Sequence, residues 1–330
     1  MRALKVLRWI LWPFSLVYGI IMEVRNFLFR KGILKSIAFD VPVISVGNIS
    51  VGGSGKTPMV KYLITKLSKD NTIGVLSRGY GRLTKGFYVV NADSKPREVG
   101  DEPLEIKTNF PEITVVVHED RILGIAELLA HNPKVDLIIL DDAYQHQYVK
   151  PTYSILLSTE QNPFYLDFVM PMGRLREFRH NVNRCDVIVF TKSTGKQLTS
   201  LFTSNKPVFY SNLTYEEPVL MHGDDSPISQ PLVVGGLANN EVFFKAMFES
   251  YPDAKAKAYP DHYSYQQKDI EAIENLAASK VVITTEKDWV KWQSILATHP
   301  SELSVYVQKT QMQLNDEDQF LTPIKQAING

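Results

Sequence analysis

Residues 46–57 read Val46-Gly-Asn-Ile-Ser-Val-Gly-Gly-Ser-Gly-Lys-Thr57 and follow a short apolar stretch that begins at Pro42. A glycine-rich segment between a buried strand and the start of a helix is typical of a phosphate-binding loop. The glycines permit torsions that turn backbone N–H groups toward phosphate oxygens, and the N-terminus of the next helix favours an anion. The segment therefore predicts a nucleotide site made by Gly52, Gly53, Ser54, Gly55, Lys56 and Thr57.

Two side chains of this loop have predicted roles toward ATP and Mg²⁺. Lys56 is expected to reach the β- and γ-phosphates, and the Thr57 hydroxyl is expected to bind Mg²⁺. One position departs from the usual pattern, because Ser50 stands where a glycine is common. Gly52 and Gly53 supply flexibility nearby, so the cradle is still expected. The alternative is a glycine-rich turn with an incidental Gly-Lys-Thr.

Continuous apolar runs on either side of the loop alternate with helical segments. Such runs, without polar alternation, suit a parallel sheet that is covered on both faces, so the fold class is α/β with a P-loop NTPase-type core. The predicted strands are 42–46, 72–76, 113–117, 135–140, 154–157 and 187–190, and the predicted helices are 57–69, 101–109 and 121–131.

A second α/β block begins near residue 230. Strands are expected at 231–235 and 281–284, with helices from 241 to 250 and from about 287. The stretch 205–230 carries three prolines and is predicted to be an extended linker. The predicted domains are a basic, apolar N-terminal helix (1–35), a kinase core (36–215) and a smaller C-terminal α/β domain (216–330).

Asp141 and Asp142 follow an apolar strand and are the predicted second half of the metal site. A carboxylate at a strand end beside a phosphate loop is a common Mg²⁺ ligand. Paired acids at such a position can instead only cap the next turn. His146, which follows closely, is more often structural when it stands alone.

Composition excludes several classes of protein. The single cysteine, Cys185, excludes an internal disulfide and a cysteine-only zinc site. The chain has 36 basic and 36 acidic residues, and this balance does not favour a nucleic-acid-binding protein. The charge is nevertheless uneven, since residues 1–36 contain seven basic residues and one acidic residue.

The N-terminal segment runs from Trp9 to Met22 without a charge, 14 residues in all. As a helix it would be about 21 Å long at ~1.5 Å per residue, which falls short of the ~30 Å bilayer core. We expect an interfacial anchor, because aromatic side chains and flanking cations suit the lipid headgroup region. A buried core helix and a true membrane span are the alternatives.

Two acidic motifs remain, and each also has a plain structural explanation. Gly100-Asp-Glu-Pro103 opens a predicted helix, where acids favour the helix dipole. Pro260-Asp-His-Tyr263 could be a turn with a surface histidine.

Taken together, these motifs resemble the tetraacyldisaccharide 4′-kinases, the lipid A 4′-kinases of Gram-negative bacteria. The resemblance extends over nearly the whole chain, from the basic N-terminus to the C-terminal domain. It is carried by GNISVGGSGKTP at 47–58, SRGYGR at 77–82, GDEP at 100–103, LDDAYQHQ at 140–147, GRLRE at 173–177, PDHYSY at 260–265 and TTEKD at 284–288. Three positions depart from the pattern: Ala143, Phe178 and the loop 235–240.

The resemblance implies transfer of the γ-phosphoryl group of ATP to the 4′-hydroxyl of an acylated glucosamine disaccharide lipid. It implies work at the cytoplasmic face of the bacterial inner membrane, where we expect a peripheral or monotopic protein. No obligate protein partner is inferred. It makes Asp101 the proposed catalytic base and His262 its partner, and it assigns no firm role to Arg176, Glu177 or the loop 235–240. Because about 160 residues separate Asp101 from His262, we expect the pair to form only if the C-terminal domain closes over the core.

Two other classes remain to be distinguished from a kinase. A nucleotide-hydrolysing switch would use the same loop, but Thr191-Lys-Ser-Thr194 lacks the aspartate that reads guanine. A membrane scaffold with an inactive nucleotide fold predicts loss of Lys56, Thr57 or the acidic pair, and all of these are present.

Overall fold

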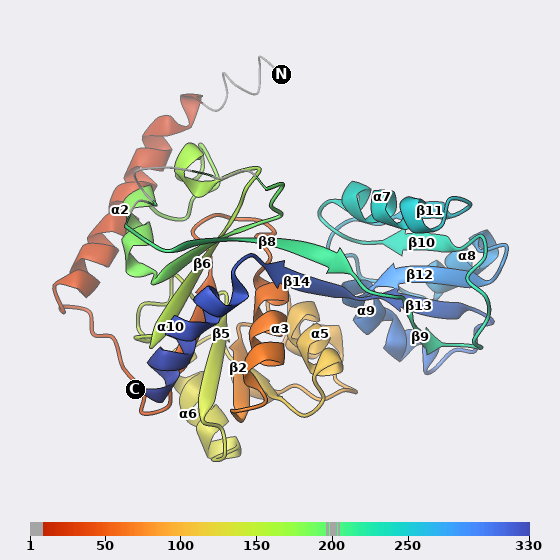
Figure 1. Ribbon diagram of the computed structural model, residues 1–330, viewed down its shortest axis with the longest axis horizontal. Coiled ribbons are helices and arrows are strands. Elements are labelled where there is room, and N and C mark those ends of the chain that lie inside the picture. Colours follow the sequence, from red (N-terminus) through yellow and green to blue (C-terminus); the bar gives the residue numbers. More distant parts are fainter. Residues whose placement is uncertain (1–8, 196–197, 199–202, 204) are drawn as a thin grey trace. The chain divides into compact units, whose positions relative to one another are not determined.

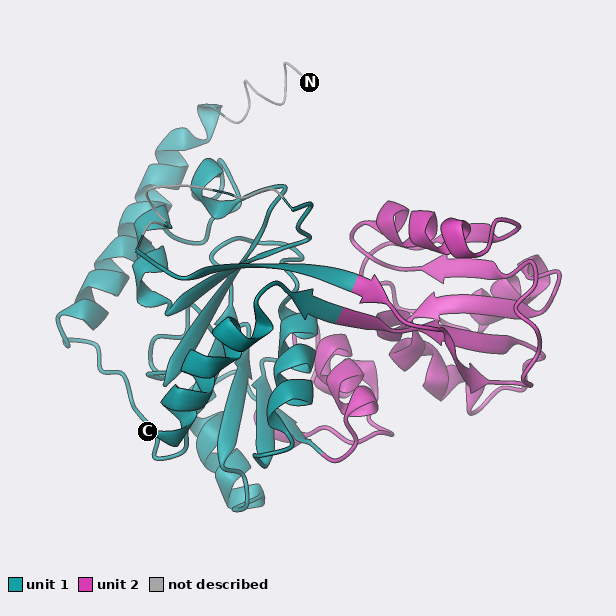
Figure 2. Ribbon diagram, in the orientation of Figure 1, with its two compact units in different colours: residues 1–78, 113–213, 312–330 teal, residues 79–112, 214–311 magenta. Residues whose placement is uncertain are grey.

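The computed structural model describes residues 9–195, 198, 203 and 205–330. Within these ranges the chain forms two compact units (Figures 1 and 2). Unit 1 comprises residues 1–78, 113–213 and 312–330, and unit 2 comprises residues 79–112 and 214–311. The basic residues Arg2, Lys5 and Arg8 of the predicted anchor lie outside the described residues.

Unit 1 is built around a parallel sheet with the order β8-β7-β6-β1-β5-β2-β4. Its elements are α2 (Trp12–Arg30), β1 (Val43–Gly47), α3 (Lys56–Leu67), β2 (Ile73–Ser77), β4 (Thr114–Val117), α6 (Arg121–His131), β5 (Leu137–Asp141), β6 (Tyr153–Thr159), η1 (Phe164–Leu166), η2 (Arg179–Arg184), β7 (Val187–Thr191) and α10 (Glu317–Asn329). Strands β1, β2, β5 and β7 are buried along their whole length, as their continuous apolar sequences predict. The predicted α/β class is confirmed.

Two strands, β8 (Val208–Tyr215) and β14 (Thr310–Leu314), are neighbours in the sheet and pass from one unit into the other. The remaining elements belong to unit 2. They are β3 (Tyr88–Val89), α4 (Pro96–Val99), α5 (Asp101–Asn109), β9 (Val219–His222), β10 (Leu232–Gly235), α7 (Asn240–Ser250), β11 (Lys255–Ala258), α8 (Gln267–Leu276), β12 (Val281–Thr285), α9 (Glu286–Leu296) and β13 (Ser304–Gln308).

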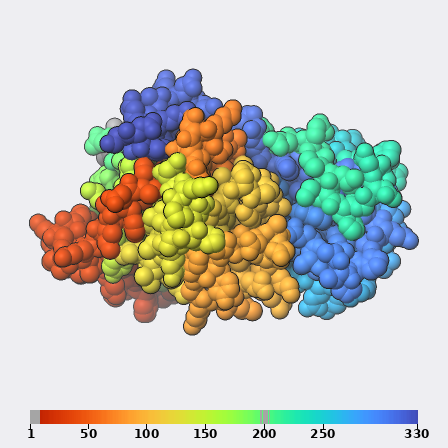
Figure 3. Space-filling view, turned by 90° about the horizontal axis from the view of Figure 1, so that it is seen from below, coloured from red at the N-terminus to blue at the C-terminus, as the bar shows by residue number. Residues whose placement is uncertain are grey.

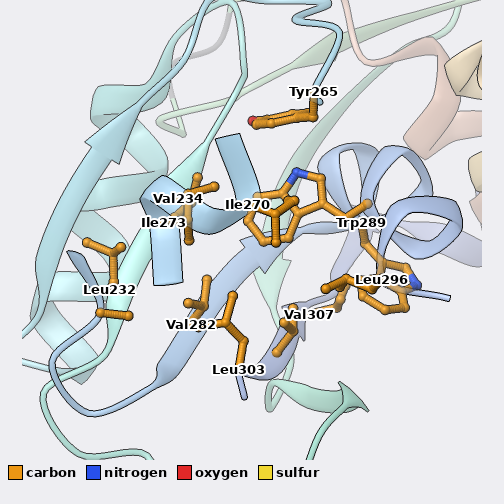
Figure 4. Close-up of a cluster of buried hydrophobic side chains, with 13 residues drawn as sticks. Leu232, Val234, Tyr265, Ile270, Ile273, Val282, Trp289, Leu296, Leu303 and Val307 are labelled. Carbon is orange, nitrogen blue, oxygen red and sulfur yellow. The ribbon is translucent and has the colours of Figure 1, made fainter. Parts of the chain in front are cut away.

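Unit 2 has its own five-stranded sheet, in the order β11-β10-β12-β13-β9, and its own core. Aromatic and aliphatic side chains from α8, α9 and the sheet pack together there (Figure 4). Trp292 is fully buried and Trp289 nearly so, and both come from α9. Helix α9 is therefore anchored by its apolar face, and this packing also fixes the direction in which its polar residues point.

The prediction of an extended linker at 205–230 is wrong. This stretch contains β8, which pairs in parallel with β7, and β9, which pairs antiparallel with β13. Pro207 and Pro218 stand immediately before the two strands. A proline is tolerated there because no ladder hydrogen bond is lost, so these residues mark strand starts rather than a linker.

The division into units also differs from the boundaries predicted from the sequence. Residues 79–112 group with 214–311, because α5 packs against α9 and Gln293 Nε2 donates to Ala92 O at 3.0 Å. Helix α10 groups with unit 1 instead of the C-terminal block. Glu317 accepts hydrogen bonds from Lys66 Nζ at 2.8 Å and Tyr62 OH at 3.1 Å, both on α3, and the two helices lie side by side in Figures 1 and 3.

Helix α2 has an unusual distribution of side chains. Its buried residues are Ser15, Gly19 and Asn26, whereas most of its large apolar side chains are exposed. A β-carbon at Gly19 would lie only 2.5 Å from the Phe178 ring, so the absence of a side chain permits the close approach. The buried-core alternative is therefore wrong for the described part of this helix. Among the described residues, no helix is long and apolar enough to cross a membrane.

Candidate functional site

The loop between β1 and α3 has the backbone that its glycines predict. Gly52 has φ +120° and Gly55, the residue before α3, has φ +84°, both in the region that favours glycine. A β-carbon added at Gly52 or Gly53 would meet no atom within 4 Å. The loop thus presents bare backbone to open space at a helix N-terminus, which is the form of an anion site.

The loop is fixed by a hydrogen bond within it and by hydrogen bonds to two other segments. Asn48 Nδ2 donates to the buried Ser54 Oγ at 2.7 Å, and Thr191 Oγ1 donates to Ser54 O at 3.0 Å. Val51 N donates to Arg174 O at 2.8 Å. These contacts fix the backbone of the loop through the protein's own groups, and a fixed set of donors is what electrostatic stabilisation of a phosphoryl group requires.

The acidic pair lies beside this loop, as predicted. Strand β1 pairs with β5 so that Val46 is opposite Asp141. Lys56 Nζ lies 3.7 Å from Asp142 Oδ1. Asp142 has φ +49°, a left-handed conformation that is strained for a residue with a side chain. The structure therefore brings Lys56 and Asp142 together at one edge of the sheet.

Asp141 has the features of a cation ligand. It is buried, Ser77 Oγ donates to its Oδ2 at 3.0 Å, and its Oδ1 has no hydrogen-bond partner among the described residues. Burial, together with the charge of Asp142, raises the pKa of Asp141. A cation beside Oδ1 would satisfy the orphaned oxygen and offset this cost. Two carboxylates, the Thr57 hydroxyl and nucleotide phosphates are a donor set that suits Mg²⁺.

Arg176 and Glu177, whose roles the sequence left open, have clear partners. Arg176 Nη1 donates to Asp142 Oδ1 at 3.3 Å and to Gln145 Oε1 at 3.0 Å. Glu177 is fully buried and forms a two-pronged ion pair with Arg184, with both N···O distances 2.8 Å. Arg176 thus contacts the acidic pair directly, whereas Glu177 is a buried anchor of the segment next to it.

Glu177 also links this segment to the N-terminal helix. Asn26 Nδ2 on α2 donates to Glu177 Oε2 at 2.8 Å, and Gln147 Nε2 donates to Asn26 Oδ1 at 2.6 Å. Arg25 Nη2 donates to Gln145 O at 2.9 Å. Helix α2 is therefore joined by hydrogen bonds to the residues around the acidic pair.

His146 lies close to this site in the sequence but is not suited to hold a positive charge. Burial lowers its pKa to about 4, and the charges of Arg121 and Arg78 act in the same direction. The side chain is therefore neutral at pH 7, in keeping with the structural role expected for it.

Asp101 and His262 form a pair within unit 2. Asp101 is the first residue of α5, and its Oδ2 lies 3.3 Å from His262 Nδ1. The expectation that this pair needs closure of the C-terminal domain is wrong, because both residues belong to the same unit. His262 has φ +55°, so its backbone, like that of Asp142, is strained.

Sequence reasoning missed two residues of the site. Ser77, which hydrogen-bonds to Asp141, is the first residue of the SRGYGR motif. Lys287, which contacts both Asp261 and His262, lies in the TTEKD motif. Both motifs can be recognised in the sequence. The residues that Ser77 and Lys287 contact lie elsewhere in the chain, so no spacing rule could connect these residues with their partners.

Comparisons with known proteins agree with this geometry. The family model described as tetraacyldisaccharide-1-P 4′-kinase matches residues 7–329. A tetraacyldisaccharide 4′-kinase of Flavobacterium johnsoniae is 40% identical over 304 residues, which is 87% of this chain and 88% of the relative. One from Cytophaga hutchinsonii is 37% identical over 344 residues, covering 99% of this chain and 97% of the relative.

A solved structure gives the same result for the fold. The crystal structure of LpxK from Aquifex aeolicus in complex with ATP has a TM-score of 0.79 to this chain at 30% identity. The match covers 98% of this chain and 99% of the other. With a phosphate loop, an adjacent acidic pair and a family match over nearly its full length, the chain belongs to the tetraacyldisaccharide-1-P 4′-kinase family.

Proposed function

We propose that the loop 52–57, the acidic pair Asp141–Asp142 and the pair Asp101–His262 carry out the phosphoryl transfer for which the family is named. The chain is a phosphotransferase with an alcohol group as acceptor. It transfers the γ-phosphoryl group of ATP to the 4′-hydroxyl of a tetraacylated glucosamine disaccharide 1-phosphate, in lipid A biosynthesis. The observation that carries the assignment of residues is the contact between Lys56 and Asp142, which joins the loop to the acidic pair.

The loop and the acids have complementary tasks. Backbone N–H groups of the loop bind the phosphates, apart from that of Ser54, which donates to Gly52 O at 3.0 Å, and Lys56 neutralises the charge that develops on the transferred group. Thr57, Asp141 and Asp142 would hold Mg²⁺, which when bound supplies further charge neutralisation at the β- and γ-phosphates. Arg176, through its contact with Asp142, keeps that carboxylate oriented.

Asp101 is the proposed base. The 4′-hydroxyl loses its proton to the Asp101 carboxylate as its oxygen bonds to the γ-phosphorus, while the bond to the β-phosphate oxygen breaks and ADP leaves with that electron pair. The acids that hold Mg²⁺ are poor bases, because the cation occupies their lone pairs. Asp101 then returns the proton to water, and His262 either orients this carboxylate or relays its proton.

Helix α2 is the proposed contact with the membrane. Phe14 and Ile21 on α2, and Trp9 shortly before it, have more than 60% of their surface exposed, and the helix ends at Arg30, which is followed by Lys31. Since its small and polar residues face the protein, its apolar side chains are available to a lipid surface. This arrangement supports peripheral or monotopic association with a membrane, and the proposed location is the cytoplasmic face of the inner membrane.

A transfer assay tests the function. The full chain is incubated with Mg²⁺, γ-³²P-ATP and the purified tetraacylated disaccharide 1-phosphate, and the lipids are separated by chromatography. We expect label on the lipid, and none when the 4′-hydroxyl is already phosphorylated. Release of inorganic phosphate at the same rate with or without acceptor would instead identify a nucleotide-hydrolysing switch, and no turnover would identify a scaffold.

A further inference from the structure

Two lysines on α9 contact the Asp101–His262 pair. Lys287 and Lys291 are four residues apart, so they project from the same side of the helix. Lys287 Nζ lies 3.3 Å from His262 Nε2, and Lys291 Nζ lies 3.4 Å from Asp101 Oδ2. The roles proposed above for the phosphate loop and the acidic pair involve neither lysine.

We propose that Lys287 and Lys291 are positioning residues for this pair: Lys287 fixes the tautomer of His262, and Lys291 fixes the carboxylate of Asp101. The proposal deepens the function proposed above and rests on it. It also decides which of the two roles His262 has.

The tautomer follows from the chemistry of the lysine. An ammonium group has hydrogens to donate and no lone pair to accept with, so His262 Nε2 must be the accepting nitrogen in the contact with Lys287. A neutral imidazole that accepts at Nε2 carries its hydrogen on Nδ1. That hydrogen points at Asp101 Oδ2, 3.3 Å away. His262 is therefore a donor to Asp101 and an acceptor from Lys287.

This assignment excludes a relay through the same nitrogen. Because Nδ1 already carries a hydrogen, His262 cannot take the proton that Asp101 receives from the acceptor hydroxyl. Its task is to hold one carboxylate oxygen by a hydrogen bond, which leaves Oδ1 of Asp101 as the oxygen for the proton. His262 is thus an orienting group, and Asp101 acts as the base.

Lys287 is itself held in place. Its Nζ donates to Asp261 Oδ1 at 2.7 Å. Burial acts to raise the pKa of Asp261, but the hydrogen bond and charge of Lys287, together with the charge and backbone N–H of His262, lower it overall. Asp261 therefore remains charged and keeps the ammonium group next to the imidazole.

Lys291 is a buried cation with two carboxylates around it. Its side chain is 6% exposed, and its Nζ lies 3.6 Å from Asp288 Oδ1 in addition to its contact with Asp101. A buried lysine without a counter-charge carries a large desolvation penalty. The position of Lys291 therefore depends on Asp101 and Asp288, and the positions of these two carboxylates depend on Lys291. Exposed ion pairs contribute little, but this one is almost fully shielded from water.

The helix that carries both lysines is held by hydrogen bonds on one side and by core packing on the other. Asp288 accepts hydrogen bonds from Gly236 N and Thr285 Oγ1, both at 2.8 Å, and from Tyr265 OH at 3.2 Å. On its other side, α9 is anchored by Trp289 and Leu296 in the core (Figure 4). This network also gives the loop 235–240 a structural role, because the backbone N–H of Gly236 donates to the Asp288 carboxylate. These contacts fix the part of α9 from which the side chains of Lys287 and Lys291 extend.

Nuclear magnetic resonance on the full chain tests the tautomer directly. Two-bond ¹H–¹⁵N spectra are recorded on protein labelled with ¹⁵N-histidine, at a pH where His262 is neutral, and its signals are identified by their absence in His262→Gln. We expect the hydrogen on Nδ1 in the wild type and in Lys287→Arg. In Lys287→Met we expect the pattern to move toward the Nε2–H form. A wild-type His262 with its hydrogen on Nε2 would overturn the proposal.

Kinetics test the consequence for catalysis. Lys287→Met removes a charge-assisted hydrogen bond to His262, and Lys291→Met removes a buried ion pair with Asp101. Each is expected to lower kcat by on the order of 10- to 100-fold, with KM for ATP unchanged. Lys291→Arg should recover part of the loss, and Lys268→Met, an exposed lysine on α8, should be neutral. Wild-type kcat in both methionine variants would refute the proposal.

The two tests separate the proposal from the function on which it rests. The spectra report the tautomer even if the protein transfers no phosphate, in which case only the proposed function fails. If Lys291→Met unfolds, Lys291→Arg decides: a kcat below wild type with an unchanged melting temperature supports a positioning role, and a wild-type kcat contradicts it.

Discussion

Lys56 is the side chain on which the phosphate-loop assignment depends most directly. Its removal leaves the developing charge on the phosphoryl group without its cation and leaves Asp142 without its partner at 3.7 Å. We expect Lys56→Ala to lower kcat by on the order of 10²–10³-fold, the cost of losing one electrostatic stabiliser. The measurement is the steady-state transfer of label to the lipid acceptor.

Lys69→Ala is the matched control, because Lys69 is an exposed lysine just beyond the end of the same helix. It should keep wild-type activity. Near wild-type transfer by Lys56→Ala would show that residues 52–57 do not act as a catalytic phosphate loop.

Asp101 and His262 should behave as one unit. Asp101→Ala removes the base and is expected to cost more kcat than His262→Ala, which only leaves the carboxylate less well oriented. The double variant should lose less than the two single losses combined, because members of one unit are not additive. ATP affinity, measured by titration calorimetry, should be nearly unchanged in all three variants.

Asp93→Ala, at an exposed acid of the same unit, is the control and should be neutral. Strictly additive losses would contradict the pair. So would a large rise in KM for ATP with unchanged kcat, and Asp101 would then be only an acid at a helix start.

Helix α2 should bind membranes through its outward face. Phe14, Val17 and Ile21 are 59–64% exposed and lie along one side of the helix. Replacing all three by serine removes about 1 kcal/mol each of apolar burial in the interface, so partition onto anionic vesicles should fall by on the order of 100-fold. Co-sedimentation with vesicles measures this, while ATP binding should not change.

The control replaces three apolar residues elsewhere that are 60–77% exposed, Leu83, Leu166 and Val242, by serine. These changes should leave vesicle binding intact. High salt should release only part of the wild-type protein, because screening weakens the attraction of the basic residues and not the apolar contact. Complete release by salt, or equal loss of binding in the control, would refute an apolar anchor.

The presence of two separate cores makes a prediction for the intact chain. Units 1 and 2 each have their own sheet and their own buried cluster. We expect scanning calorimetry to show more than one transition, since two cores need not unfold together. Mg²⁺-ATP at 100 times its Kd should stabilise the unit that contains the loop by about 2.7 kcal/mol and raise its transition.

Lys56→Ala should abolish this shift without removing either transition. A single transition with equal calorimetric and van't Hoff enthalpies would contradict independent cores. A shift of equal size in the Lys56→Ala protein would show that the nucleotide binds elsewhere.

The amino-acid sequence alone was sufficient for most of the features that depend on neighbouring residues. The apolar runs that became β1, β2, β5 and β7, the phosphate loop and the helix that begins with Asp101 were all predicted within one or two residues. Strand burial, glycine torsions and helix starts are local properties, so a few residues contain the necessary information. The ordered motifs also pointed to the correct family.

Tertiary structure decided what depends on contacts between distant residues. It turned the expected linker at 205–230 into β8 and β9, and it put residues 79–112 into the same unit as 214–311. That grouping is why Asp101 and His262 meet without any closure. Hydrogen bonds and packing between segments that are not neighbours in the chain leave no periodic trace in the sequence, so Lys287 and Lys291 could be connected with this pair only once the chain was folded.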